Sequence, residues 1–159
     1  MTEDARFEDG GERPLRLKAL DAEDMPIVAA LVQDAVFPVT EMSWDRRERR
    51  FAILLNRFRW EDKAAAERRS REFERVQTVM VIDDVMGVRS QGFDRADKDL
   101  VLSVLTISFE PGEDGSGRIE ITLAGDGAIR LDVEALGVTL RDVTRPYAAP
   151  SGHAPGHPE

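Results

Sequence analysis

Residues 118–134 read RIEITLAGDGAIRLDVE, and this stretch decides the fold class. Apolar and polar side chains alternate on both sides of a glycine-rich centre, which is the pattern of two half-buried strands joined by a tight turn. Pairing Leu123 with Ile129 keeps the apolar side chains of both strands on one face. That register leaves residues 125–127 as the loop and places Gly127 in a left-handed conformation. The stretch therefore predicts an antiparallel hairpin.

The apolar phase slips by one residue after Val133, because the next inward-facing set comprises Leu136, Val138 and Leu140. Continuing the same strand would turn this whole set to the wrong face. We therefore expect a β-bulge or a sheet corner at residues 135–137.

Other stretches upstream have the composition of strands. The longer ones are residues 15–20, 51–55, 76–88 and 100–109. Asp83 and Asp84 interrupt the third of these. Met42 and Trp44 share one face of a shorter strand, which ends at a polar turn.

One main helix is expected at residues 24–36. Apolar side chains recur there at helical spacing, Pro26 fits only the first turn, and the helix should end before Pro38. The sequence thus predicts an α+β fold, with a mainly antiparallel sheet of about seven strands. The helix packs on a face of this sheet or caps the end of a barrel, and both arrangements remain open.

The 159 residues are enough for one domain, which we place at residues 14–145. Polar or proline-rich stretches at residues 1–13 and 146–159 are expected to be flexible tails. Residues 61–74, rich in alanine and charge, form a short exposed helix or a mobile loop. No secretory signal and no long apolar stretch is present, so we expect a cytoplasmic protein without a membrane span.

The charge is unevenly distributed. The whole chain carries a net charge of −9, which argues against a general nucleic-acid binder. Residues 45–75 nevertheless hold 11 basic and 7 acidic side chains, and most of the basic ones are arginine. Weak nucleic-acid contact through residues 46–75 therefore stays an alternative, although nucleic acid is not the expected partner.

Few side chains suit catalysis or metal binding. The sequence has no cysteine, and its two histidines, His153 and His157, lie among prolines in the C-terminal stretch. These features exclude a Cys nucleophile and give no zinc-binding pattern in the domain. We therefore expect no metal and no cofactor, and a non-catalytic role is favoured while an enzymatic one stays open.

The string NRFRWE at residues 56–61 is the most distinctive local feature. In a strand, Arg57 and Arg59 would share one face, with Asn56 and Trp60 on the other. Paired arginines can hold a carboxylate or a phosphate, and an aromatic face can stack against a ligand. The alternative is a strand end whose aromatics enter the core and whose arginines pair with nearby acids.

Asp83 and Asp84 lie in an apolar run. If this run is one continuous strand, one carboxylate faces inward and could act as an acid or base. If the run turns there, both carboxylates face water, and this interpretation is favoured.

Several strings together resemble a known family. They are LRLKALDAED (15–24), LVQDAV (31–36), RFA (50–52), NRFRWE (56–61), VRSQG (88–92) and the hairpin at 125–132. In these the chain resembles the bacterial proteins catalogued as domain of unknown function 2948, over nearly all of residues 14–145. The resemblance implies a small cytoplasmic protein and supplies no catalytic residues.

The leading hypothesis is a non-catalytic binding or interaction domain with a protein partner. The alternative is a binding protein or enzyme that holds an anionic small molecule with Arg57 and Arg59, with Asp83 or Asp84 as a base. If neighbouring acids neutralise both arginines, this alternative should be dropped. A homo-oligomer formed through an unpaired sheet edge also remains open.

Overall fold

A computed structural model describes residues 14–62, 74–145 and 147–148, which form an 11-stranded sheet with one α-helix. The strands are β1 (Arg16–Ala19), β2 (Val36–Pro38), β3 (Met42–Asp45), β4 (Arg50–Phe58), β5 (Glu74–Ile82), β6 (Val85–Gln91), β7 (Val101–Pro111), β8 (Gly117–Leu123), β9 (Ala128–Val133), β10 (Val138–Asp142) and β11 (Tyr147–Ala148). The helix is α1 (Met25–Val32), and the 3-10 turns are η2 (Ala22–Asp24), η3 (Val39–Glu41) and η4 (Trp60–Asp62). All strand pairs are antiparallel, which confirms the α+β prediction with more strands than expected.

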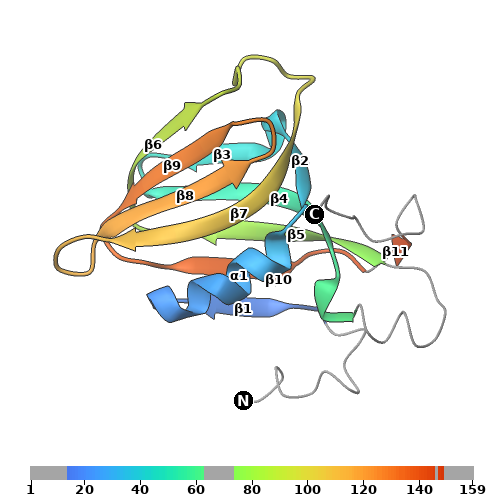
Figure 1. Ribbon diagram of the computed structural model, residues 1–159, viewed down its shortest axis with the longest axis horizontal. Coiled ribbons are helices and arrows are strands. Elements are labelled where there is room, and N and C mark those ends of the chain that lie inside the picture. The colour runs from blue at the N-terminus through green and yellow to red at the C-terminus, as the bar shows by residue number, and fades with distance from the viewer. Residues whose placement is uncertain (1–13, 63–73, 146, 149–159) are drawn as a thin grey trace.

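The sheet folds over into two layers but does not close. Its order is β1-β10-β5-β4-β2-β7-β8-β9-β6, with β3 beside β4 and β11 beside β5. Figure 1 shows β6 to β9 in front of the layer that contains β3, β4 and β5. The short strand β2 joins the layers, because it pairs with β4 on one side and β7 on the other. The arrangement is therefore an open, barrel-like sandwich whose terminal strands, β1 and β6, do not meet.

The helix is shorter than predicted. It ends at Val32, and Asp34 adopts a left-handed conformation with φ of 64°. The backbone N–H of Asp34 donates to the carbonyl of Val104 on β7, which turns the chain into β2. Val36 and Phe37 favour a strand, and the residue before Pro38 avoids the helical region. The expected helix at residues 24–36 is therefore wrong at its C-terminal end.

The corner predicted at residues 135–137 is confirmed. Strand β9 lies between β8 and β6, whereas β10, which follows it, lies between β1 and β5 in the other layer. The hairpin register is wrong by two residues, since Ile129 pairs with Ile121 and not with Leu123. Gly125 and Asp126 take the positive φ angles, at 82° and 72°, instead of Gly127. A shift of two residues keeps every apolar side chain on its predicted face.

Helix α1 packs against β7 and β4 and contributes Met25, Val28 and Val32 to a single hydrophobic core that both layers share. No helix of the described residues has the length and apolar character needed to cross a membrane. The predicted tail at residues 1–13, most of the segment 61–74 and most of the tail 146–159 lie outside the described residues.

Candidate binding site

Arg57 on β4 is a charged side chain with no solvent exposure. Its Nε donates to Thr78 Oγ1 at 2.8 Å, and its Nη1 donates to the Phe58 carbonyl at 3.0 Å. Nη1 and Nη2 also donate to the two carboxylate oxygens of Glu61, each at 2.9 Å. Nη2 completes the set with Asp142 Oδ1 at 3.0 Å. Every N–H of the guanidinium thus has a protein acceptor.

The two carboxylates around Arg57 are themselves buried. The Asp142 side chain is 2% exposed, and it also accepts hydrogen bonds from Thr78 Oγ1 at 2.7 Å and from the Leu15 N–H at 2.8 Å. Burial opposes the charge of Glu61, but the hydrogen bond and charge of Arg57 outweigh it and lower the pKa of the Glu61 carboxyl. Burial likewise opposes the charge of Arg57, yet Glu61 and Asp142 raise its pKa overall. The Arg57–Glu61 pair therefore stays ionised, and the network connects β4, β5 and β10.

The other residues of the NRFRWE string also contact protein groups. Arg59 Nη1 pairs with the Glu74 carboxylate, and the Arg59 N–H donates to the Glu74 carbonyl at 3.0 Å. Trp60 Nε1 donates to the carbonyl of Gln33 at 2.9 Å, just after α1. The Trp60 ring centroid lies 5.6 Å from that of Phe58.

Asn56 completes this cluster. Its carbonyl accepts a hydrogen bond from Arg75 Nη1 at 3.2 Å. The Arg75 guanidinium also stacks over the Phe58 ring, with its carbon 4.0 Å from the centroid. The hydrogen bonds and ring contacts of this string therefore connect β4 to β5 and to the end of α1.

Asp83 and Asp84 lie in the turn between β5 and β6, so the favoured interpretation of a turn is the one observed. Their side chains are 38% and 47% exposed. Asp83 accepts a hydrogen bond from Arg50 Nε at 3.0 Å. Arg49 Nη2 lies 3.7 Å from Asp84 Oδ1 and 2.8 Å from Glu134 Oε1.

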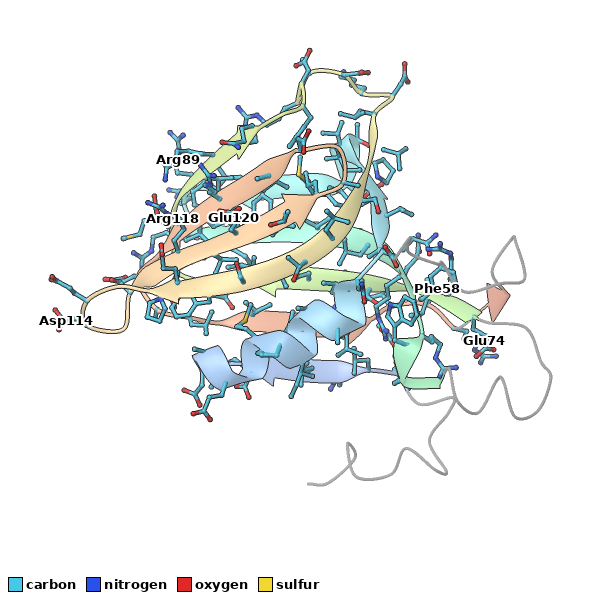
Figure 2. The ribbon with its side chains drawn as sticks, viewed as in Figure 1. Phe58, Glu74, Arg89, Asp114, Arg118 and Glu120 are labelled. Carbon is cyan, nitrogen blue, oxygen red and sulfur yellow. The ribbon has the colours of Figure 1, made fainter. Side chains whose placement is uncertain are left out.

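The structure separates the sequence-predicted site residues into two groups. Arg57 and Arg59 lie near one end of β4, whereas Asp83 contacts Arg50 at the other end, about 23 Å away along the strand. Figure 2 shows Phe58 and Glu74 at one side of the molecule. Acidic neighbours engage both arginines, which is the condition set above for dropping the anion-holding pair with an Asp83 or Asp84 base.

The described part of the arginine-rich segment does not form one basic surface. Arg57 and Arg59 are buried, and Arg49 and Arg50 contact acids at the turn before β4. Among its described arginines, only Arg46 and Arg47 are exposed without an ion pair to another described residue.

A cleft of about 620 Å³ opens elsewhere, between β3 in one layer and β6 in the other. Its apolar lining comprises Val39, Met42, Trp44, Phe51, Val88, Phe93, Ala96 and Ile129, and its polar lining comprises Ser43, Ser90, Asp94 and Arg95. Among the described residues, β3 pairs only with β4 and β6 pairs only with β9, so each has one free edge. The hydrogen bond from the Val85 N–H to the Arg49 carbonyl, at 2.8 Å, brings the start of β6 to the turn after β3. The loop after β6, which carries Phe93, forms another wall.

The polar groups of the cleft differ in the hydrogen bonds and ion pairs that they form. Asp94 Oδ1 accepts a hydrogen bond from the Ala96 N–H at 2.9 Å, so it stabilises its own loop. Arg95 is exposed and has no ion pair or side-chain hydrogen bond to another described residue. Trp44 is half-buried, and its indole N–H likewise has no acceptor among the described residues. The cleft thus offers an aromatic surface, two hydroxyls and an available cation.

A family model described as a protein of unknown function (DUF2948) matches residues 15–157. The chain belongs to the DUF2948 family. No curated protein and no solved structure matches the DUF2948 chain. The family description names no activity for this DUF2948 domain.

Sequence reasoning did not identify the cleft of the DUF2948 domain. The alternation places Met42 and Trp44 on one strand face, but nothing in it shows that β6 lies across from them. The loop around Asp94 and Arg95 has the composition of an ordinary solvated loop. The one sequence signal for the cleft was Trp44, a large aromatic side chain on a strand too short to bury it.

Within the described residues, no group of three acidic or histidine side chains could hold a metal ion.

Proposed function

We propose that this chain is a non-catalytic binding protein whose ligand occupies the cleft between β3 and β6. The observation that carries the proposal is the open sheet, in which α1 packs against β7 and β4 while the free edges of β3 and β6 flank a cleft. A volume of about 620 Å³ lies within the range of sites that hold small ligands or a few side chains. The half-buried Trp44 is a residue type that contributes strongly to recognition.

The chemistry of the lining supports binding rather than catalysis. Asp94 is the one carboxylate that lines the cleft, and its hydrogen bond to the Ala96 N–H gives it a structural task. Acid–base catalysis needs a titratable group within reach of the substrate, and Oδ1 of Asp94 is occupied by the Ala96 N–H.

The test compares two substitutions on adjacent residues of β6. Ser90→Arg places a long side chain in the cleft, whereas Gln91→Arg adds the same side chain at an exposed position outside the lining. The full-length protein and both variants would be used to capture molecules from an extract of the native host, with mass spectrometry of proteins and small molecules. The unfolding midpoints of the variants would be measured first, to confirm that both are folded.

We expect a protein or small molecule that the unmodified chain and Gln91→Arg retain and that Ser90→Arg loses by about tenfold or more. Identical capture by all three proteins would contradict the proposal. A ligand that Gln91→Arg loses and Ser90→Arg retains would place binding on the outer face of the sheet instead.

A further inference from the structure

Within the described part of the chain, β3 and β6 each have one edge without a partner strand, and Arg95 has no ion pair. On this basis we infer that the ligand of the cleft is an extended peptide segment of a partner protein that carries a carboxylate. This inference rests on the proposed function and names the class of ligand for the same site. The partner would add a strand beside β6 and place a carboxylate near Arg95.

Strand β6 is suited to receive another strand. It pairs with β9 along residues 87–91, and among the described residues its other edge has no partner. A strand paired on one side presents alternate N–H and C=O groups to whatever lies along its free edge. The paired length corresponds to about 17 Å of strand, so a segment of about five residues would cover it.

The side chains of β6 alternate in the way that peptide recognition requires. Val88 and Ser90 line the cleft, whereas Arg89 and Gln91 are exposed outside it. Figure 2 shows Arg89 at the outer margin of the sheet. A peptide strand beside β6 would likewise direct every second side chain inward, toward Trp44. Main-chain hydrogen bonds then supply affinity, and the inward side chains supply specificity.

The cation in the lining of the cleft favours an acidic residue in the peptide. Arg95 is the one basic side chain of the lining, and it has no ion pair with a described residue. The neighbouring Asp94 is turned to the Ala96 N–H. A guanidinium without an ion pair to any described acid is available to pair with a carboxylate of a ligand.

The test measures binding of three synthetic pools of nonapeptides to the full-length chain by fluorescence anisotropy. All pools alternate Val or Leu with a polar residue, which is Asp or Glu in the first pool, Lys or Arg in the second and Ser or Thr in the third. A fourth pool repeats the acidic one with alternate backbone nitrogens methylated. Random-sequence RNA of nine nucleotides is the fifth probe.

We expect the acidic pool to bind about tenfold more tightly than the basic one. Methylation should abolish this binding, because it removes the main-chain donors. Arg95→Glu should weaken binding of the acidic pool by about tenfold, whereas Lys98→Glu should not. Lys98 is an exposed cation in the same loop that does not line the cleft, so it is a matched control.

Equal binding of the three peptide pools, or equal binding of the methylated pool, would overturn the peptide inference. RNA binding that Ser90→Arg abolishes would also overturn it and would assign the cleft to nucleic acid. If no peptide binds but the capture experiment yields a small molecule lost in Ser90→Arg, the peptide inference fails and the proposed function stands. If neither experiment yields a ligand, both fail.

Discussion

Arg57 and Glu61 form a bidentate ion pair at the buried end of β4, with both N···O distances at 2.9 Å. The pair lies four residues apart in sequence and spans the transition from β4 to η4. Arg57 also pairs with Asp142 on β10, so this local contact is linked to a strand that is distant in the sequence. This geometry assigns the most distinctive string of the sequence to holding the fold together.

Removing Arg57 should destabilise the protein strongly. Arg57→Met leaves two buried carboxylates, Glu61 and Asp142, without their counter-charge, which we expect to lower the free energy of unfolding by about 3–5 kcal/mol. Urea unfolding monitored by circular dichroism measures this change. Arg50→Met is the matched control, because Arg50 pairs with Asp83 in water and its loss should barely move the midpoint. Equal effects of the two substitutions would contradict the account.

Glu61 should make stability depend on pH in the acidic range. The pKa of its carboxyl is lower in the folded chain than in the unfolded chain, so the unfolded chain takes up the proton first as the pH falls. Its contribution is therefore complete above the usual carboxyl pKa of about 4.5 and is lost as the pH falls through the folded value. Unfolding midpoints measured from pH 7 to pH 3 should fall less steeply for Glu61→Gln than for the unmodified chain. Parallel curves would show that Glu61 does not carry this dependence.

The hydrogen bond from Trp60 Nε1 to the Gln33 carbonyl connects η4 to the end of α1. Trp60→Phe keeps the aromatic contact but removes the donor, so we expect a loss of about 0.5–1.5 kcal/mol. The same variant leaves Trp44 as the sole tryptophan. Its fluorescence should be quenched by acrylamide, because Trp44 is partly exposed in the open cleft. Fluorescence inaccessible to the quencher would mean that the cleft is closed in solution.

Gly92 begins the loop that forms one wall of the cleft, and its φ is +81°. A Cβ at this position would lie 2.7 Å from the Asp126 carbonyl oxygen and 2.7 Å from the Gly127 Cα. Gly115 has a similar φ of +83° but open space around it. Gly115→Ala should therefore cost about 1 kcal/mol, and Gly92→Ala about 1–3 kcal/mol more, in urea unfolding. Equal losses of stability for the two substitutions would mean that the loop after Gly92 shifts to make room for the Cβ at no cost in unfolding free energy.

The sequence predicts which side chains of a strand face inward better than it predicts which residues of neighbouring strands pair. Alternation around Ile119 and Ile121 gives the correct inward set even though the predicted hairpin register is wrong by two residues, since faces repeat with that period. The end of α1 could not be predicted from periodicity, because a hydrogen bond from Asp34 to Val104, far along the chain, turns it into β2. Local patterns carry no information about such contacts.

The candidate site was harder to predict for the same reason. Arg57 and Arg59 have the chemistry of an anion site, and only the positions of Glu61, Asp142 and Glu74 show that they serve the fold. The cleft forms where β3 and β6 approach each other across two layers of the sheet. A sequence specifies which residues face inward, but it does not show which strands lie at an edge of the sheet.

The most direct test of the central claim is amide hydrogen exchange of β6 in the full-length chain, with and without the ligand that Ser90→Arg fails to capture. Strand β1 is the internal control, because it is the opposite terminal strand and, among the described residues, pairs only with β10. The account predicts that the ligand slows exchange at residues 87–91 by about tenfold or more and leaves β1 unchanged. Unchanged exchange in β6, or slower exchange in β1 alone, would contradict it.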